Sequence, residues 1–192
     1  MSMDIIFIAD CLESTQPLIR VATKSDYRIL KFIESNDDVS QYVKPLCPDV
    51  LIFVSDEIDR MLLRQMRAVS EKRPTPMIIF TRDAHTESIN AAVKAGASTY
   101  VVDCHEPERL GSLIGVARAR FEQQQSLKNE LLQTKNALHE RKNVDKAKGI
   151  IMKTKSLSED QAYSALRKLA MNHNKRIGEI AEQIISAAEI LV

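Results

Sequence analysis

The chain has no tryptophan, and its 192 residues include 5 glycines, 6 prolines and 3 cysteines. Cys11, Cys47 and Cys104 are odd in number and lack the paired spacing of metal ligands, so we expect reduced, mostly buried thiols. The four histidines cluster with no carboxylate or cysteine. The sequence therefore predicts neither a metal site nor a bound cofactor.

Long apolar stretches are also missing. No run free of Asp, Glu, Lys and Arg exceeds eight residues, which is too short for a membrane-spanning helix or for the apolar core of a secretory signal. We therefore expect a cytoplasmic protein. The length indicates one domain of ordinary size with a smaller attachment.

Positive charge is concentrated in one part of the chain. The net charge is only +1, yet between Arg141 and Arg176 ten Lys and Arg residues stand against three acids, a local excess of seven. Such an excess on a nearly neutral chain indicates a polyanionic partner. A solvated helix face that binds nothing remains the alternative.

Four short apolar runs rich in Ile, Val and Phe occupy residues 4–10, 49–55, 76–81 and 98–103, and a weaker alternating run covers 27–33. Continuous runs of this kind are typical of strands covered on both faces. Segments of helical length lie between them, at about 13–23, 37–43, 57–70 and 87–95. The pattern predicts an α/β domain over residues 1–105, a doubly wound parallel sheet of flavodoxin-like order.

Good helix formers dominate from residue 106 to about 154. Two apolar seams follow the spacing of a short, irregular heptad: Ala117, Phe121 and Gln124, then Leu127, Leu131, Thr134 and Leu138. A helix that is polar on most faces needs a partner to bury such a seam. We expect a coiled-coil helix over 106–135 that forms a homodimer.

The tail, residues 136–192, predicts a compact bundle of three helices. Ser158 and Gln161 have the spacing of a capping box, which opens a helix running to about residue 172. A last helix covers about 176–191. The predicted core positions are Ala162, Leu166, Leu169 and Ala170 on the first of these helices and Ile177, Ile180, Ala181, Ile184 and Ala188 on the second.

The order of the first five strands and the residues at their ends resemble the receiver domain of bacterial response regulators. That resemblance implies an acidic pair that binds magnesium, an aspartate that accepts a phosphoryl group, and a hydroxyl and a lysine that respond to it. In this chain Ala9 and Asp10 replace the acidic pair, Val54 stands at the acceptor position, Thr81 keeps the hydroxyl, and Asp103 replaces the lysine. The sequence predicts a degenerate receiver.

Two neighbours of Val54 could substitute for the missing acceptor. Because side chains alternate along a strand, we expect Ser55 to turn away from the site and Asp56 to lie in the loop. Tyr100 occupies the usual switch position, and we interpret it as a strand aromatic that packs on a helix. Our hypothesis is a domain switched by docking of another protein; a phosphorylation-dependent response regulator is the alternative.

The tail resembles the ANTAR domain, an RNA-binding output module of antitermination regulators. The match lies in ALHER (137–141), Val144, AKGIIMK (147–153), QAYSALRKLAM (161–171) and IGEIAEQII (177–185). The resemblance implies a regulator, not an enzyme, that binds leader mRNA hairpins of nitrate- and nitrite-assimilation genes or of an amidase operon. It also implies a ligand-sensing partner protein, NasS-like or AmiC-like.

Helical geometry sorts the lysines of the tail into faces. Val144, Ala147 and Ile151 form an apolar stripe bordered by Arg141, Lys148 and Lys155, while Lys142, Lys146 and Lys153 form a separate face around Gly149. Gly149 either admits an RNA group or packs against a neighbouring helix. The candidate RNA-binding residues are Arg141, Lys142, Lys146, Lys148, Gly149, Lys153, Tyr163, Arg167, Lys168, Lys175 and Arg176.

Tyr163 has two interpretations of equal weight, a ring on which an unpaired base stacks and a core residue. Two further interpretations of the whole tail remain. It could belong to a coiled-coil adaptor that binds only protein, with the lysines serving solubility. A helix-turn-helix DNA binder is less favoured, because no recognition helix with base-reading side chains follows a short glycine turn.

Overall fold

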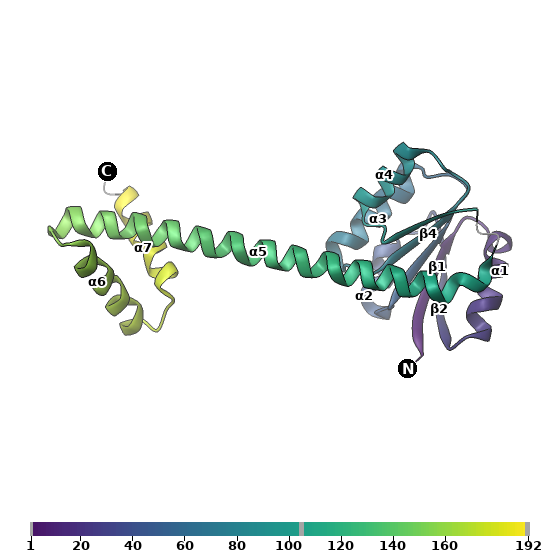
Figure 1. Cartoon of the computed structure of the whole chain (residues 1–192), viewed down its shortest axis with the longest axis horizontal. Helices are drawn as coiled ribbons and strands as arrows, with labels where there is room; N and C mark the ends of the chain where they lie inside the picture. Colours follow the sequence, from purple (N-terminus) through teal and green to yellow (C-terminus); the bar gives the residue numbers. More distant parts are fainter. Residues whose placement is uncertain (1, 104–105, 191–192) are drawn as a thin grey trace. The chain divides into compact units, whose positions relative to one another are not determined.

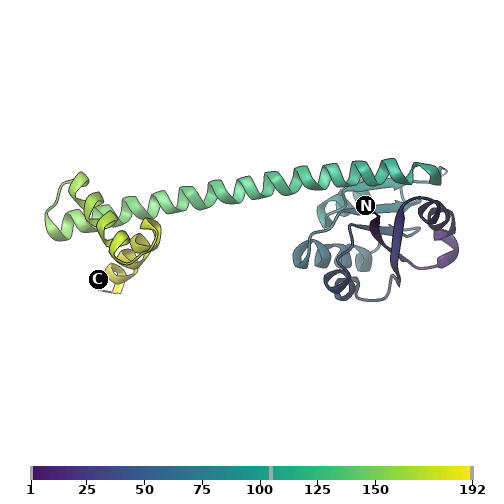
Figure 2. The same cartoon turned by 90° about the horizontal axis from the view of Figure 1, so that it is seen from below.

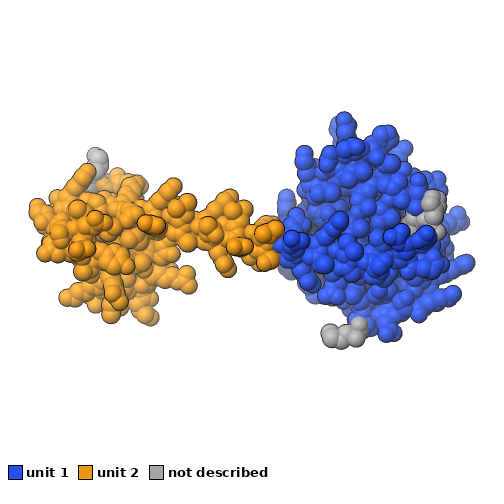
Figure 3. Space-filling model, in the orientation of Figure 1, with its two compact units in different colours: residues 1–125 blue, residues 126–192 orange. Residues whose placement is uncertain are grey.

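The computed structural model describes residues 2–103 and 106–190. The chain divides into two compact units, residues 1–125 (unit 1) and 126–192 (unit 2), coloured separately in Figure 3. Unit 1 alternates strands with helices, and the described residues of unit 2 form helices and the turns that join them (Figure 1). Cys104, one of the predicted buried thiols, lies outside the described residues.

Five strands of unit 1 form one parallel sheet in the order β2-β1-β3-β4-β5. They are β1 (Met3–Ala9), β2 (Tyr27–Glu34), β3 (Val50–Val54), β4 (Met77–Thr81) and β5 (Thr99–Val102). From β1 the chain adds β2 on one side, and from β3 it adds β4 and β5 on the other, so β1 and β3 flank the point where the order of the strands switches. In such sheets functional sites lie at the carboxyl ends of these two strands. The predicted flavodoxin-like fold is confirmed.

Helices cover both faces of the sheet. One face packs against α2 (Val39–Leu46), α3 (Arg60–Lys72) and α4 (Thr86–Ala95), and the other against α1 (Leu12–Lys24) and the start of α5 (Leu110–Lys155). Along β1, Ile6 and Ile8 belong to the first core while Ile5 and Phe7 belong to the second. Because both faces are buried, the strands have continuous apolar runs.

The segment after β5 is one α-helix of 46 residues, α5 (Figure 2), preceded by a 3-10 turn, η1, at Pro107–Arg109. Pro107 is compatible with the first position of this turn because an amide hydrogen there would have no partner within the turn, and the α-helix follows from Leu110. Ala117, predicted for the coiled-coil seam, is instead buried with Leu110 and Ile114 in the core of unit 1. Residues 126–142 are exposed throughout.

The end of α5 packs with α6 (Glu159–Asn172) and α7 (Ile177–Ile190) in unit 2. The capping box is confirmed, since the Ser158 hydroxyl accepts the Gln161 N–H while the Gln161 side chain accepts the Ser158 N–H. Leu169 is 40 % exposed, so its predicted core position is wrong. The buried residues of this core are Ala147, Ile151, Ala162, Leu166, Ala170, Ile180, Ala181 and Ile185.

The cysteine prediction is wrong at two positions. Cys11 and Cys47 are exposed because each lies at a helix end. The Cys11 sulfur accepts the Glu13 N–H at the start of α1, and Cys47 ends α2 in the left-handed region with φ 50°. Among the described residues, no helix is both long and apolar enough to cross a membrane.

Candidate nucleic-acid interface and degenerate receiver site

The carboxyl ends of β3, β4 and β5 enclose a hollow of about 230 Å³. Val54 pairs with Ala9 in the register of the sheet, so two apolar side chains occupy neighbouring strand ends. Asp103, with φ 48°, is exposed on the rim. A carboxylate at the former lysine position makes this hollow a poor binding site for a phosphoryl group.

Ser55 does not turn away from the site as expected. Its hydroxyl donates to the Glu57 carbonyl at 2.8 Å and lies 3.3 Å from Asp10 Oδ2. The alternation rule fails because β3 ends at Val54 and Ser55 belongs to the loop. Asp56 lies in the loop as predicted and is 3.5 Å from the Arg82 guanidinium, with both side chains exposed.

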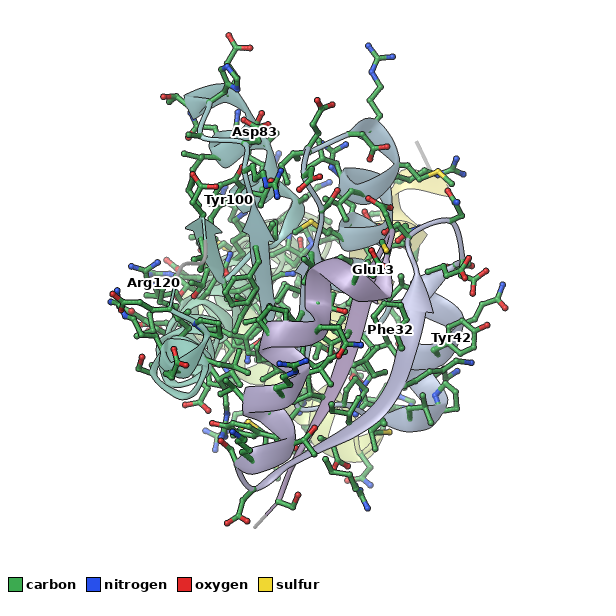
Figure 4. The ribbon with its side chains drawn as sticks, turned by 90° about the vertical axis from the view of Figure 1, so that its right-hand side faces the viewer. Glu13, Phe32, Tyr42, Asp83, Tyr100 and Arg120 are labelled. Atoms are coloured by element: carbon green, nitrogen blue, oxygen red, sulfur yellow. The ribbon has the colours of Figure 1, made fainter. Side chains whose placement is uncertain are left out.

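The Thr81 hydroxyl is bound to the two loops that follow β3 and β4. It donates to the Asp56 carbonyl at 3.0 Å and accepts the Asp83 N–H at 3.1 Å. Tyr100 packs against the first core, and its hydroxyl donates to the Asp83 carbonyl at 2.7 Å. Figure 4 shows Tyr100 and Asp83 at the same end of the sheet. Burial raises the pKa of Tyr100, which keeps this hydroxyl a donor.

A receiver fold implies a magnesium ion, but the residues at these strand ends do not fit one. Asp10 is the single carboxylate left from the acidic pair, and its β1 neighbour is Ala9. In the part of the chain that the structure describes, no three His, Cys, Asp or Glu side chains lie close enough to hold a metal. The ligand set for a hard cation is therefore incomplete.

In unit 2, Lys142, Lys146, Gly149 and Lys153 follow one line along α5, which we call the α5 stripe. Lys142 and Lys153 are exposed, and neither forms an ion pair with another described residue. Lys146 is also exposed but lies 2.8 Å from Glu189 of α7. A Cβ added to Gly149 would meet nothing within 4 Å. Close helix packing therefore does not explain this glycine, and the stripe is open.

Lys148 has a different environment from the α5 stripe. Its ammonium lies 2.8 Å from Asp145 and 2.7 Å from Glu159, and only 15 % of its side chain is exposed. Hydrogen bonds to Asp145 and Glu159 raise its pKa. Lys148 thus joins α5 to the first turn of α6 and is not available to a polyanion in this conformation. The sequence does not indicate the ion pair between Lys148 and Glu159, because Glu159 lies beyond the turn that follows α5.

The α6 helix exposes an aromatic ring and a cation one turn apart. Tyr163 is 44 % exposed, outside the core of unit 2, and Arg167 and Met171 follow at intervals of four residues. Met171 is 73 % exposed and was not predicted from the sequence, although its spacing from Tyr163 and Arg167 could have revealed it. The remaining candidates are all exposed: Arg141, Lys168, Lys175 and Arg176.

Comparisons with known proteins agree with this division. Residues 132–185 match the ANTAR domain. Over 74 residues the chain is 39 % identical to the nitrate regulatory protein of Klebsiella oxytoca, covering 38 % of this chain and 19 % of that protein. It is 26 % identical over 117 residues to the transcriptional regulatory protein PdtaR of Mycobacterium tuberculosis, covering 61 % of this chain and 57 % of PdtaR. The chain thus spans less than two thirds of either relative.

Solved structures resemble unit 1 in fold. The signal receiver domain of a modulated diguanylate cyclase from Desulfovibrio desulfuricans aligns with a TM-score of 0.56 at 13 % identity, covering 65 % of this chain and 99 % of that domain. The signal receiver domain of NarL from Mycobacterium tuberculosis aligns with a TM-score of 0.53 at 15 % identity, covering 61 % of this chain and 97 % of that domain. The chain combines a receiver-like fold in unit 1 with a segment in unit 2 that matches the ANTAR domain.

Proposed function

We propose that this chain is an RNA-binding transcription antitermination regulator resembling the nitrate-assimilation antiterminator NasT. Its ANTAR domain holds hairpins of a leader mRNA and prevents the terminator from forming. The observation that carries the proposal is the coincidence of the ANTAR match over 132–185 with the open α5 stripe. Both named relatives are regulatory proteins, one of them a nitrate regulator.

The exposed residues supply two kinds of contact. Lys142 and Lys153 attract phosphates and gain affinity by releasing counterions, whatever the base sequence. Tyr163 offers a face on which an unpaired loop base stacks, and Arg167 beside it can bind a phosphate or a base plane. Phosphate contacts give affinity, and a stacked loop base favours hairpins over plain duplexes.

Control comes from another protein in this proposal, not from phosphorylation. Val54 cannot accept a phosphoryl group, and the strand ends lack a magnesium ligand set among the described residues. An inducer-sensing protein, NasS-like or AmiC-like, sequesters the chain in the cytoplasm until nitrate or nitrite arrives. The active form is a homodimer that uses the exposed leucines of α5.

The proposal is tested by gel-shift titration of a leader hairpin against the variant Lys142→Gln/Lys153→Gln. We expect weaker binding and a salt dependence of log K that is shallower by about 0.7 for each phosphate that the variant no longer neutralises. The matched control is Lys24→Gln/Lys94→Gln, which removes two exposed lysines of α1 and α4. Equal affinity for all three proteins would refute the site, and failure of the wild-type chain to bind any leader RNA would refute the function.

A further inference from the structure

Helix α3 carries three arginines on one line. Arg60, Arg64 and Arg67 are spaced by four and three residues and lie opposite the buried residues Leu62 and Met66. All three are exposed, and among the described residues none has an ion-pair partner. Because none of these guanidinium groups is engaged in an ion pair with a described residue, this arginine row is available for binding.

A hollow of about 310 Å³ adjoins the arginine row between α2 and α3. Arg64 belongs to the arginine row and also lines this hollow. Met61, which is 46 % exposed, lines the hollow as well. Gln65 forms its floor and fixes the loop before α2 by donating to the carbonyls of Ser35 and Asp37. The surface thus combines cations, an exposed thioether and a recess, and Arg and Met are enriched at protein–protein interfaces.

Carboxylates in the same surface argue against a nucleic acid as its occupant. Asp37 and Asp38 line the hollow, and Glu71 continues the arginine row at the next turn of α3. Hydrogen bonds, first of all from Ser40, lower the pKa of Asp38, so this group is charged at neutral pH. A phosphate backbone would be repelled by these groups, whereas a folded protein can place acidic side chains against the arginines alone.

We propose that the arginine row and the adjoining hollow are the docking surface for an acidic segment of the sensor protein that keeps the chain inactive. Carboxylates of the partner pair with Arg60, Arg64 and Arg67, and an apolar side chain beside them enters the hollow next to Met61. This inference rests on the proposed function, since it assumes an antiterminator held by a sensor. It assigns the inhibitory contact to unit 1 and leaves the RNA-binding residues of unit 2 untouched.

The test is a charge-reversal variant, Arg60→Glu/Arg64→Glu/Arg67→Glu, in a host whose leader–reporter fusion responds to nitrate through the wild-type chain. We expect reporter expression without nitrate to rise to the induced level, while gel-shift affinity for the leader RNA stays unchanged. The control is Arg20→Glu/Lys24→Glu/Lys94→Glu, which makes the same change of charge at exposed positions of α1 and α4. It should remain inducible.

Each other outcome is decisive. A reversal variant that stays inducible overturns the docking surface, and a variant that loses both RNA affinity and reporter expression shows that the arginines hold RNA instead. If circular dichroism reveals misfolding, Arg60→Gln/Arg64→Gln/Arg67→Gln gives the same test with a smaller change. A wild-type chain that binds no leader RNA would refute the proposed function, independently of this surface.

Discussion

At the scale of single residues, two glycines have opposite roles. A Cβ on Gly149 would meet nothing, whereas a Cβ on Gly96 would collide with Ser70, and the φ of Gly96 is +110°. We expect Gly149→Ala to stabilise unit 2 by roughly 1 kcal/mol through helix propensity and to weaken RNA binding. Gly96→Ala should destabilise unit 1 by at least about 1–2 kcal/mol. Thermal unfolding and gel-shift titration measure both effects.

The Gly96 variant is the control for RNA binding, because it changes unit 1 and leaves unit 2 unaltered. If Gly149→Ala were more stable and bound RNA as well as the wild type, the open surface at Gly149 would not be an RNA contact. If Gly149→Ala were less stable than the wild type, the added methyl group would collide with a neighbouring group, and the surface at Gly149 would not be open.

Some features of single residues could not be predicted from the sequence. The charge excess of the tail and the separate face of Lys142 and Lys153 were visible in the sequence, but the pairing that makes Lys148 unavailable was not. It depends on Glu159, which lies beyond the turn after α5. The orientation of Ser55 depended on the last residue of β3, and strand ends are the feature that sequence patterns determine least well.

At the scale of elements, the β4–α4 loop should respond to acid. A hydrogen bond from Ser88, followed by one from the His85 backbone, lowers the pKa of Asp83 from 3.8 to about 2. A depressed folded-state pKa stabilises the protein above the unfolded value, and this stabilisation is lost as pH falls from about 3.8 through about 2. Asp83→Asn should therefore be less stable than the wild type at neutral pH, with the difference shrinking in acid.

Urea unfolding of both proteins across this pH range measures the difference in the free energy of unfolding. The Tyr100 hydroxyl contacts the backbone carbonyl of residue 83, so the substitution preserves that bond. A difference that stays constant with pH would contradict the role of the carboxylate.

Whole elements were predicted well where local chemistry determines them. Strands buried on both faces have continuous apolar runs, and the α6 start follows from its capping box. The surface of α3 was missed, although the spacing of Arg60, Arg64 and Arg67 is readable. Sequence alone could not say which charged residues have partners, and only the lack of ion pairs with other described residues distinguishes this row.

At the scale of the whole molecule, the exposed seam of α5 predicts self-association. Leu127, Leu131 and Leu138 are 59 %, 55 % and 54 % exposed and lie on one line. Replacing all three with Gln, a good helix former, should convert a dimer to a monomer in sedimentation measurements. Leu132→Gln is the matched control, since Leu132 is 57 % exposed but lies off this line. A dimer that survives the triple substitution would place the interface elsewhere.

The exposed middle of α5 has a further consequence. Residues 126–131 are exposed, contribute no buried side chain to either core and precede the segment that matches the ANTAR domain. A recombination junction within this stretch disrupts neither core as long as the helix stays continuous. Evolution, or an engineer building chimeras, can therefore graft a new sensory half or a new output half at this point.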